Sequence, residues 1–487
     1  MKRLFVALAV LSLFACTAAA PAPESPKAPA EVPITSKSTE AIDHFKKGRD
    51  LADNSRLAEA AQEFEQALKL DPDFALAMAY HGSVTPGADG TKELEAAEAK
   101  AASLPKPEQL LIGAMLATRH GEFGKADDLW KQVADAVPTD WRVQNGRGAQ
   151  LYGAERYADA IDALNKAVSI NPNAGPAYNM IGYAHLVQGE AAPAIDALKK
   201  YASLLPDEPN PQDSLGEALM ADGKFADAEA AFRKALSLSP KFSVAWEGVA
   251  YSKFFAHDWA AGRDALAKGR EAAIRPADRI SVDRLGAFAS LAEGKTADGL
   301  KQLDAIDKSP DAAAIDKAST PASRALVLVE MGRHRDAVSE AAQSIAAADS
   351  GQLRPGGAAF LRPFALAVTA SAQGRMGDAA SAQKTLEALQ TASAAEPDDP
   401  NLKSAVQFAQ GMLAVAQKDM KAARAHFDMC SNQDTYCHWQ SFEVSRKAGD
   451  SAGANASFSR LTKIYRRIPL YLYARAAASR MQPKQTN

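Results

Sequence analysis

The stretch from Tyr178 to Pro206 reads YNMIGYAHLVQGEAAPAIDALKKYASLLP, and its small, large and proline residues recur at a fixed distance along the chain. Four such columns have a spacing of 34 positions. They are a proline column (Pro138, Pro172, Pro206, Pro240), an alanine column (Ala126, Ala160, Ala194, Ala228), a large-residue column (Trp130, Leu164, Leu198, Phe232) and a glycine column (Gly148, Gly182, Gly216, continued by Ala250). Because proline is only about one residue in twenty, this register is not an accident.

Each column has a physical reason. Glycine inside a helix costs about 1 kcal/mol relative to alanine, so its repetition indicates close approach of a second helix. The alanines supply a matching small surface on that second helix, and we expect the large residues to fill the gap between neighbouring hairpins. Proline ends the second helix because the residue before it is disfavoured in the α region. Short turns such as residues 222–224 join the two helices.

These columns resemble the tetratricopeptide repeat, a helix-turn-helix unit of this period. The copy at residues 178–206 matches best, later copies follow at 215–240 and 246–266, and an earlier one includes Ala60, Phe64, Ala67 and Pro72. The resemblance implies an all-α, right-handed superhelical solenoid over residues 39–275. One divergent copy between Pro72 and Pro138 is interpreted as containing a Gly- and Pro-rich loop at 81–90.

Residues 276–487 keep the order of turn, small residue and packing residue seen in the repeats, but not their strict spacing. Turns precede a small and then a packing residue at 294–303, 332–341, 418–427 and 449–458. We interpret this half as divergent helical hairpins with a basic C-terminal capping helix. No segment shows a sustained period of two, so essentially no sheet is expected.

The N-terminus has the features of an export signal. Lys2 and Arg3 precede an apolar run at residues 4–14, which is too short to span a bilayer. The run ends before Cys16 in a pattern that resembles a bacterial lipobox, so residues 1–15 are interpreted as a lipoprotein signal peptide and Cys16 as the lipidation site. The alternative is an ordinary signal-peptidase cut near residues 18–20. For a lipoprotein of Gram-negative bacteria, Thr17 after the cysteine implies the outer membrane.

Residues 16–38 contain five prolines among Ala, Ser and Lys and are interpreted as an extended linker. At about 3.1 Å per residue it could reach roughly 70 Å from a membrane.

The net charge and the motif content of the sequence exclude some classes of function. The formal net charge is -3, which gives no electrostatic footprint for nucleic acid. No nucleotide-binding loop, zinc-helix motif or nucleophile elbow is present. We therefore expect no catalytic residues, no enzyme activity, no cofactor and no metal. The histidines at 44, 81, 120, 185, 257 and 334 have no metal-ligand spacing.

One cluster has several interpretations. His426, Cys430, Cys437 and His438 lie close together in the sequence. A disulfide between Cys430 and Cys437 is favoured, because an exported protein meets an oxidising compartment and, with Cys16 set aside, the cysteine number is even. Free cysteines, or a zinc or copper site made by all four residues, are the alternatives.

Two surfaces are candidates for partner binding. The resemblance implies that first helices line a concave groove, with groove-facing positions at Asn145, Asn179, Tyr183, Asp213, Glu217, Glu247 and Tyr251. This face either holds a peptide or helix with polar and basic groups or is a solvated inner surface. After Asp450 the chain contains no acid but seven basic residues, Arg460, Lys463, Arg466, Arg467, Arg475, Arg480 and Lys484. That tail is either a capping helix with a solvated charged face or a patch for a partner or an anionic surface.

The leading hypothesis is a non-catalytic protein-interaction scaffold of the cell envelope, anchored in the outer membrane by lipid and facing the periplasm. Its partner would be a protein or peptide bound in the concave groove. The alternative is a periplasmic module for a glycan or small ligand, which would need a closed pocket with stacked aromatic residues. A metal-binding or enzymatic C-terminal domain is a third possibility.

Overall fold

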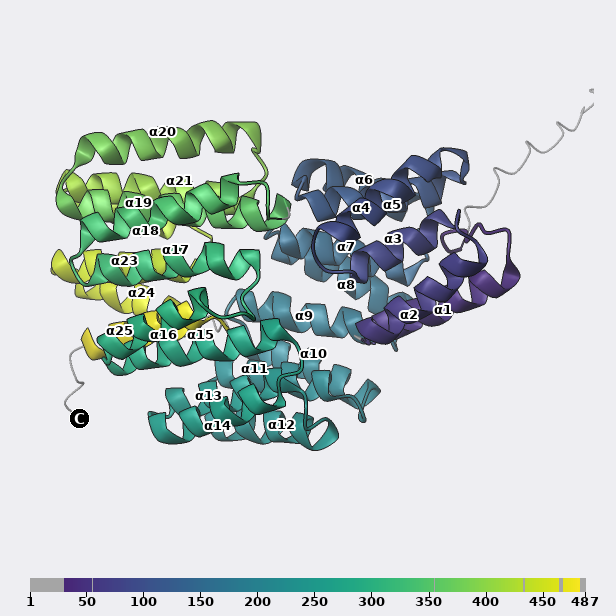
Figure 1. The fold of residues 1–487 in the computed structure, drawn as a ribbon, viewed down its shortest axis with the longest axis horizontal. Coiled ribbons are helices and arrows are strands. Elements are labelled where there is room, and N and C mark those ends of the chain that lie inside the picture. Colours follow the sequence, from purple (N-terminus) through teal and green to yellow (C-terminus); the bar gives the residue numbers. More distant parts are fainter. Residues whose placement is uncertain (1–29, 55, 354, 432–433, 464–466, 482–487) are drawn as a thin grey trace, which may run out of the picture.

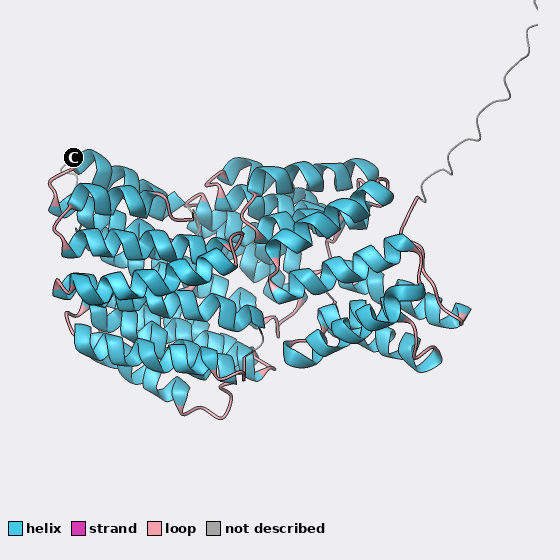
Figure 2. Ribbon diagram, turned by 90° about the horizontal axis from the view of Figure 1, so that it is seen from above, coloured by secondary structure: helices cyan, strands magenta, loops and turns pink. Residues whose placement is uncertain are grey.

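The protein is all-helical in the part that this computed structural model describes, residues 30–54, 56–353, 355–431, 434–463 and 467–481 (Figure 2). These residues form twenty-five α-helices, one short 3-10 helix and no strand. The predicted helical solenoid is confirmed. None of the described helices combines the length and the apolar character that crossing a bilayer requires.

The first part of the chain builds seven antiparallel hairpins. Their helices are α1 (Thr39–Asp53), α2 (Leu57–Leu70), α3 (Ala75–Val84), α4 (Gly87–Lys100), the 3-10 helix η1 (Ala101–Ser103), α5 (Lys106–His120), α6 (Phe123–Ala136), α7 (Trp141–Gly153), α8 (Tyr157–Ile170), α9 (Gly175–Val187), α10 (Ala191–Leu204), α11 (Pro209–Ala221), α12 (Phe225–Leu238), α13 (Ser243–Phe255) and α14 (Trp259–Ala272). The predicted turn at residues 222–224 joins α11 to α12, and Gly223 adopts the left-handed conformation there with φ 77°.

The glycine column is where the two helices of a hairpin meet. A Cβ atom at Gly182 would lie 2.5 Å from Cγ of Leu198, and one at Gly216 would lie 2.6 Å from Cε1 of Phe232. The large residue therefore packs on the glycine of its own hairpin. The large residues were expected to fill the gap between neighbouring hairpins, so this packing within a hairpin corrects that expectation. Phe232 does both, since a Cβ at Gly248 of the next hairpin would also lie 2.5 Å from its ring.

The divergent copy between Pro72 and Pro138 contains no Gly- and Pro-rich loop at 81–90. That interpretation is wrong because α3 runs to Val84 and α4 starts at Gly87. The two glycines in this stretch permit a tight crossing: a Cβ at Gly82 would lie 2.7 Å from the carbonyl oxygen of Gly90. The glycines therefore mark helix packing, and only Thr85 and Pro86 connect the two helices.

The second part continues as hairpins of longer and less regular helices. They are α15 (Pro276–Glu293), α16 (Thr296–Asp307), α17 (Ala314–Glu330), α18 (His334–Asp349), α19 (Pro355–Met376), α20 (Ala379–Ala395), α21 (Pro400–Ala416), α22 (Met420–Asp428), α23 (Thr435–Lys447), α24 (Ser451–Lys463) and α25 (Pro469–Met481). α14 packs against α15. One buried apolar cluster extends from Met220 in α11 to Ala478 in α25, so the core is continuous across residue 275.

The chain bends back on itself. Figure 1 shows α1–α8 on one side, α15–α25 on the other, and α9–α14 joining them. α25 packs against α15 and α23, and α19 touches α5. The loop at residues 396–399 faces Glu122 and the first turn of α6. The C-terminal helix therefore lies against repeats that precede it by almost two hundred residues.

Residues 30–38, the last part of the predicted linker, are bound to the repeats. The backbone N–H of Val32 donates to Asp140 at 3.0 Å, that of Thr35 to Glu108 at 3.2 Å, and that of Lys37 to Asp71 at 2.9 Å. Glu108 is fully buried. Residues 30–38 of the predicted linker are therefore not free, because three carboxylates from different repeats satisfy backbone groups of this extended segment. Residues 16–29 of that linker lie outside the described residues.

Candidate functional site

Four predicted groove residues occupy one column on successive first helices. Asn145 lies on α7, Asn179 on α9, Asp213 on α11 and Glu247 on α13, each 34 positions after the one before. We call this set the polar column. α7, α9, α11 and α13 pack against one another in this order, so the four positions follow one another along the stacked first helices.

The two asparagines form the unpaired half of the polar column. Both side chains are half-buried. The amide oxygens of Asn145 and Asn179 accept no hydrogen bond from the described part of the chain. These two oxygens are themselves buried. A buried polar atom without a partner costs about 1–3 kcal/mol, so a donor that reaches the oxygen when the half-buried amide turns outward is favoured.

The two acids form the covered half. Asp213 is 4% exposed and Glu247 is 8% exposed. The guanidinium of Arg467, from the C-terminal tail, donates to both carboxylate oxygens of Asp213 at 3.0 Å each. Nε of Arg467 lies 2.8 Å from a carboxylate oxygen of Glu217. The interpretation of a solvated inner face is therefore wrong for α11 and α13.

Burial dominates the electrostatics around Arg467. It raises the pKa of Glu247 to about 7, although the nearby Arg467 lowers it in part. Burial also raises the pKa of Glu217, again against the effect of Arg467. The pKa values of Tyr183 and Tyr251 lie well above the usual value because both phenols are desolvated. Tyr183 donates to Ser214 at 3.2 Å.

Three arginines of the predicted basic tail contact the rest of the described chain. Arg475 lies over the ring of Phe255, with its guanidinium carbon 4.5 Å from the ring centroid. Arg480 donates to the carbonyl oxygen of Ala292, and Arg460 pairs with Asp428. Arg460 and Arg475 are half-buried and therefore depart from the predicted solvated charged face, whereas Arg480 is exposed. The side chains of Lys463, Arg466 and Lys484 lie outside the described part of the chain.

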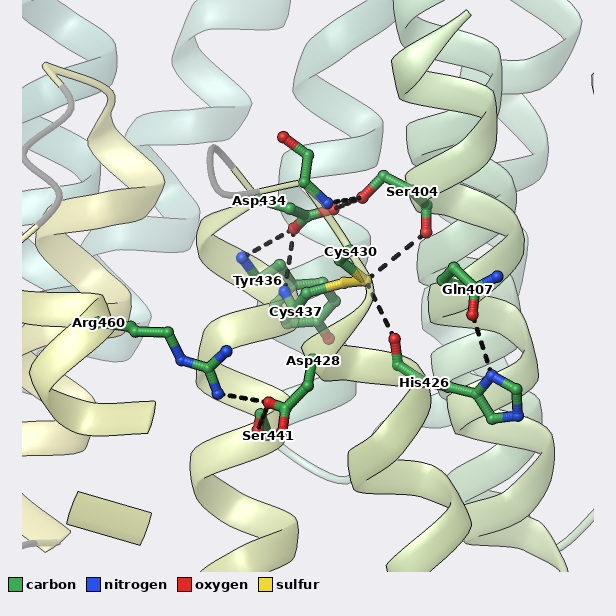
Figure 3. Close-up of a disulfide and its surroundings, with 11 residues drawn as sticks. Ser404, Gln407, His426, Asp428, Cys430, Asp434, Tyr436, Cys437, Ser441 and Arg460 are labelled. Atoms are coloured by element: carbon green, nitrogen blue, oxygen red, sulfur yellow. Dashed lines mark hydrogen bonds and ion pairs between the residues drawn. A yellow bond between two sulfur atoms is a disulfide. The ribbon is translucent and has the colours of Figure 1, made fainter. Parts of the chain in front are cut away.

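Cys430 and Cys437 are joined in a disulfide that links the end of α22 to the start of α23 (Figure 3). Both cysteines are buried. Asp434 lies beside the disulfide and caps α23 by accepting the backbone N–H groups of Tyr436 at 3.1 Å and Cys437 at 2.9 Å. Ser404 of α21 donates to the same carboxylate at 2.8 Å. The disulfide thus belongs to a helix junction.

The four residues considered as a metal site do not converge. His426 turns toward Gln407, whose amide oxygen lies 3.0 Å from its Nδ1 (Figure 3). Within the described residues, the group with metal-ligand proximity is Cys430, Asp434 and Cys437. Both sulfur atoms of that group are already bonded to each other. Cys16 lies outside the described residues.

A second buried charge cluster was not anticipated from the sequence. Arg375 of α19 pairs with Glu330 of α17 and Glu443 of α23, at 2.9 Å in each case. Gln440 and Tyr436 complete the contacts. Burial raises the pKa of Glu330 to about 7. The cluster joins α17, α19 and α23 in the C-terminal half.

A signal for the Arg467 contact was present in the sequence. Three groove carboxylates lie on neighbouring repeats, and the tail is free of acids and rich in arginine. Charge complementarity alone could have linked the two surfaces. No local pattern identified Arg467 among the seven basic residues.

Models of the tetratricopeptide repeat match residues 45–84, 113–176, 151–209 and 212–242. The matched segments include α7, α9 and α11 and thus most of the polar column. A comparison with curated proteins gave no match.

Several solved structures are similar over part of the chain. MamA from Desulfovibrio magneticus RS-1 is 19% identical over 35% of this chain and 97% of its own, with a TM-score of 0.32. PilW, described as a widely conserved type IV pilus biogenesis factor, is 18% identical over 47% of this chain and 92% of its own, with a TM-score of 0.31. YrrB, described as a TPR protein with an unusual peptide-binding site, is 17% identical over 36% and 91%, with a TM-score of 0.30.

Proposed function

Because the chain carries tetratricopeptide repeats between residues 45 and 242, we propose that it is a non-catalytic scaffold of the bacterial cell envelope that holds a protein or peptide partner on its concave face. The observation that carries the proposal is the division of the polar column. Asn145 and Asn179 have amide oxygens without a donor from the described residues, whereas Asp213 is paired with Arg467.

The partner site in this proposal is the inner face of α7 and α9. Tyr178 and Tyr183 are half-buried on the same helix as Asn179. Amide side chains bind backbone groups of a peptide, and tyrosines supply contact area at low cost in conformational entropy. The site therefore suits an extended or helical segment of a protein partner.

The membrane anchor is a separate part of the proposal. We propose that Cys16 carries lipid and holds the scaffold at the outer membrane, facing the periplasm. Since residues 30–38 are bound to the repeats, thirteen residues remain between Cys16 and the bound segment. At about 3.1 Å per residue they reach at most about 40 Å, so the concave face stays near the membrane.

A glycan-binding module is less well supported. A cavity of about 170 Å³ borders Phe360, Phe364, Phe408 and Tyr436. The rings of Phe360 and Phe364 are stacked with centroids 6.4 Å apart. A cavity of about this size holds one benzene ring, so it fits a single side chain or small group better than a chain of sugars.

The partner site is tested with a double variant, Asn145→Ala with Asn179→Ala, crosslinked in intact cells and captured. We expect the yield of crosslinked partner to fall at least about tenfold, as expected for loss of two central contacts. The matched control is Asn165→Ala on α8, where the side chain is exposed. Equal capture by wild type and double variant would move the site elsewhere.

The anchor is tested with Cys16→Ser. We expect the variant to leave the membrane fraction, and the wild type to yield a lipidated N-terminal peptide by mass spectrometry. Membrane fractionation of the variant, together with an unmodified wild-type peptide, would refute the anchor and leave the partner site untouched.

A further inference from the structure

The groove of α11 and α13 contains a complete binding site for one guanidinium group. Asp213 receives Arg467 through two parallel hydrogen bonds, and Glu217 lies at its third nitrogen. The carbonyl oxygen of Val244 accepts from the same group at 3.3 Å, and the ring of Phe232 lies 5.2 Å from the guanidinium carbon. Planar, forked donation of this kind distinguishes arginine from lysine.

The ligand of this site is the end of the same chain. Residues 467–481, here called the C-terminal strap, comprise Arg467, Ile468 and helix α25. Tyr471 and Leu472 are buried, and Tyr471 meets Phe255 of α13 edge to face at 5.9 Å. The strap thus presents one arginine followed by an apolar helical face, the features of a helix bound in a groove.

The beginning of the strap borders a cavity, while its last three residues are exposed. Ile468 and Leu470 border the cavity of about 170 Å³, together with residues of α19, α21 and α23. Empty space beside these side chains removes van der Waals contacts that would hold them. Of the strap's arginines, Arg467 alone faces the three carboxylates Asp213, Glu217 and Glu247. This end of the strap is therefore where displacement can begin.

We infer that the acidic groove of α11 and α13 is a binding site specific for arginine, and that the C-terminal strap occupies it. A partner binds there by presenting an arginine and an apolar helix in place of the strap. This inference rests on the proposed function, since it extends partner binding from α7 and α9 to the covered half of the polar column. The strap then acts as an intramolecular competitor. Tethering gives it an effective concentration in the millimolar range, so only a matching ligand displaces it.

The test uses the full-length protein and a fluorescent synthetic peptide with the sequence of residues 464–481. Wild type should bind the peptide weakly, because its own strap occupies the site. The Arg467→Ala protein should bind it at least about tenfold more tightly, as expected when the competing arginine is removed. A peptide carrying Arg467→Lys should bind that protein at least about tenfold more weakly than the arginine peptide.

A second variant keeps the inference testable if the Arg467→Ala protein fails to fold. Tyr471→Ala loosens the strap but leaves Arg467 and the groove acids unchanged, and it should also bind the peptide more tightly than wild type. Hydrogen exchange should show α25 opening below the global unfolding free energy in wild type. The inference is overturned if both folded variants fail to bind the peptide and α25 exchanges only through global unfolding. Capture at Asn145 and Asn179 is unaffected by that result, so failure of the proposed function is seen separately.

Discussion

Arg467 and Asp213 are 254 positions apart in the sequence and share two hydrogen bonds of 3.0 Å. This pair closes the C-terminal end of the chain onto the concave face of its own repeats. It divides the polar column into a part paired with the chain's own arginine and a part whose amide oxygens have no partner among the described residues. Both the proposed function and the inference about the strap depend on this division.

The Arg467→Ala substitution should lower the free energy of unfolding by about 1–3 kcal/mol. Breaking a buried ion pair on one side usually costs about 3–5 kcal/mol, because the remaining charge stays buried. Here the loss is limited, since the strap can open and Asp213 and Glu217 can regain water. Urea denaturation measures the change, with Arg335→Ala on the exposed face of α18 as the control. A loss above about 4 kcal/mol contradicts a displaceable strap.

Stability should fall as the pH rises from about 5 to 8, in part because of Glu247. Its pKa is raised from 4.5 to about 7 in the folded protein, so the folded state holds the proton more strongly than the unfolded state does. The contribution is present below about 4.5 and is lost as the pH rises through about 7. Glu247→Gln should flatten this dependence by up to about 3 kcal/mol. Thermal melts between pH 5 and 8 measure this dependence. An unchanged pH profile in Glu247→Gln contradicts the raised pKa of Glu247. The control is Glu271→Gln, at an exposed position of α14.

Gly182→Ala should destabilise the protein by about 2 kcal/mol, although alanine is the better helix former. The added methyl group would lie 2.5 Å from Leu198 and force the two helices of the hairpin apart. Gly153→Ala is a matched control on α7, because a Cβ there has no neighbour within 4 Å. The control should be neutral or up to about 1 kcal/mol more stable. Equal effects in chemical denaturation argue against steric packing at Gly182.

The disulfide should contribute about 2 kcal/mol, because it closes a short loop between α22 and α23. Cys430→Ser with Cys437→Ser should lower the free energy of unfolding by that amount, as should a reducing agent added to wild type. The reducing agent should leave the double variant unchanged, which serves as the control. A variant as stable as wild type would show that Asp434 and the helix contacts hold this junction unaided.

The regular part of the fold could be predicted from the sequence because its determinants are local. Gly182, Leu198 and Pro206 lie within one repeat, and each acts on a helix or turn a few residues away. The same reasoning failed at residues 81–90, where Gly82 and Gly90 resemble loop residues but serve close helix packing. A glycine has the same appearance in the sequence whether a turn or a neighbouring helix requires it.

The candidate site was predicted only in part for a different reason. Asn145, Asn179, Asp213 and Glu247 were placed on the concave face by the repeat register alone. Their environments depend on tertiary contacts with Arg467, which no local pattern encodes. The segment at residues 30–38 is similar, because its backbone is held by Asp71, Glu108 and Asp140 from three separate repeats. The composition predicted a free linker, but buried carboxylates at helix ends accept hydrogen bonds from the backbone of this segment and hold it against the repeats.

The most direct test of the partner-binding groove is a photo-crosslinking amino acid placed at Asn179 and, separately, at Asn165 in the full-length protein in cells. Asn179 lies in the unpaired half of the polar column, and Asn165 lies exposed on the second helix of the preceding hairpin. We predict a discrete crosslinked protein at position 179 and none at position 165. Crosslinking at 165 with none at 179 would contradict a partner site on the concave face.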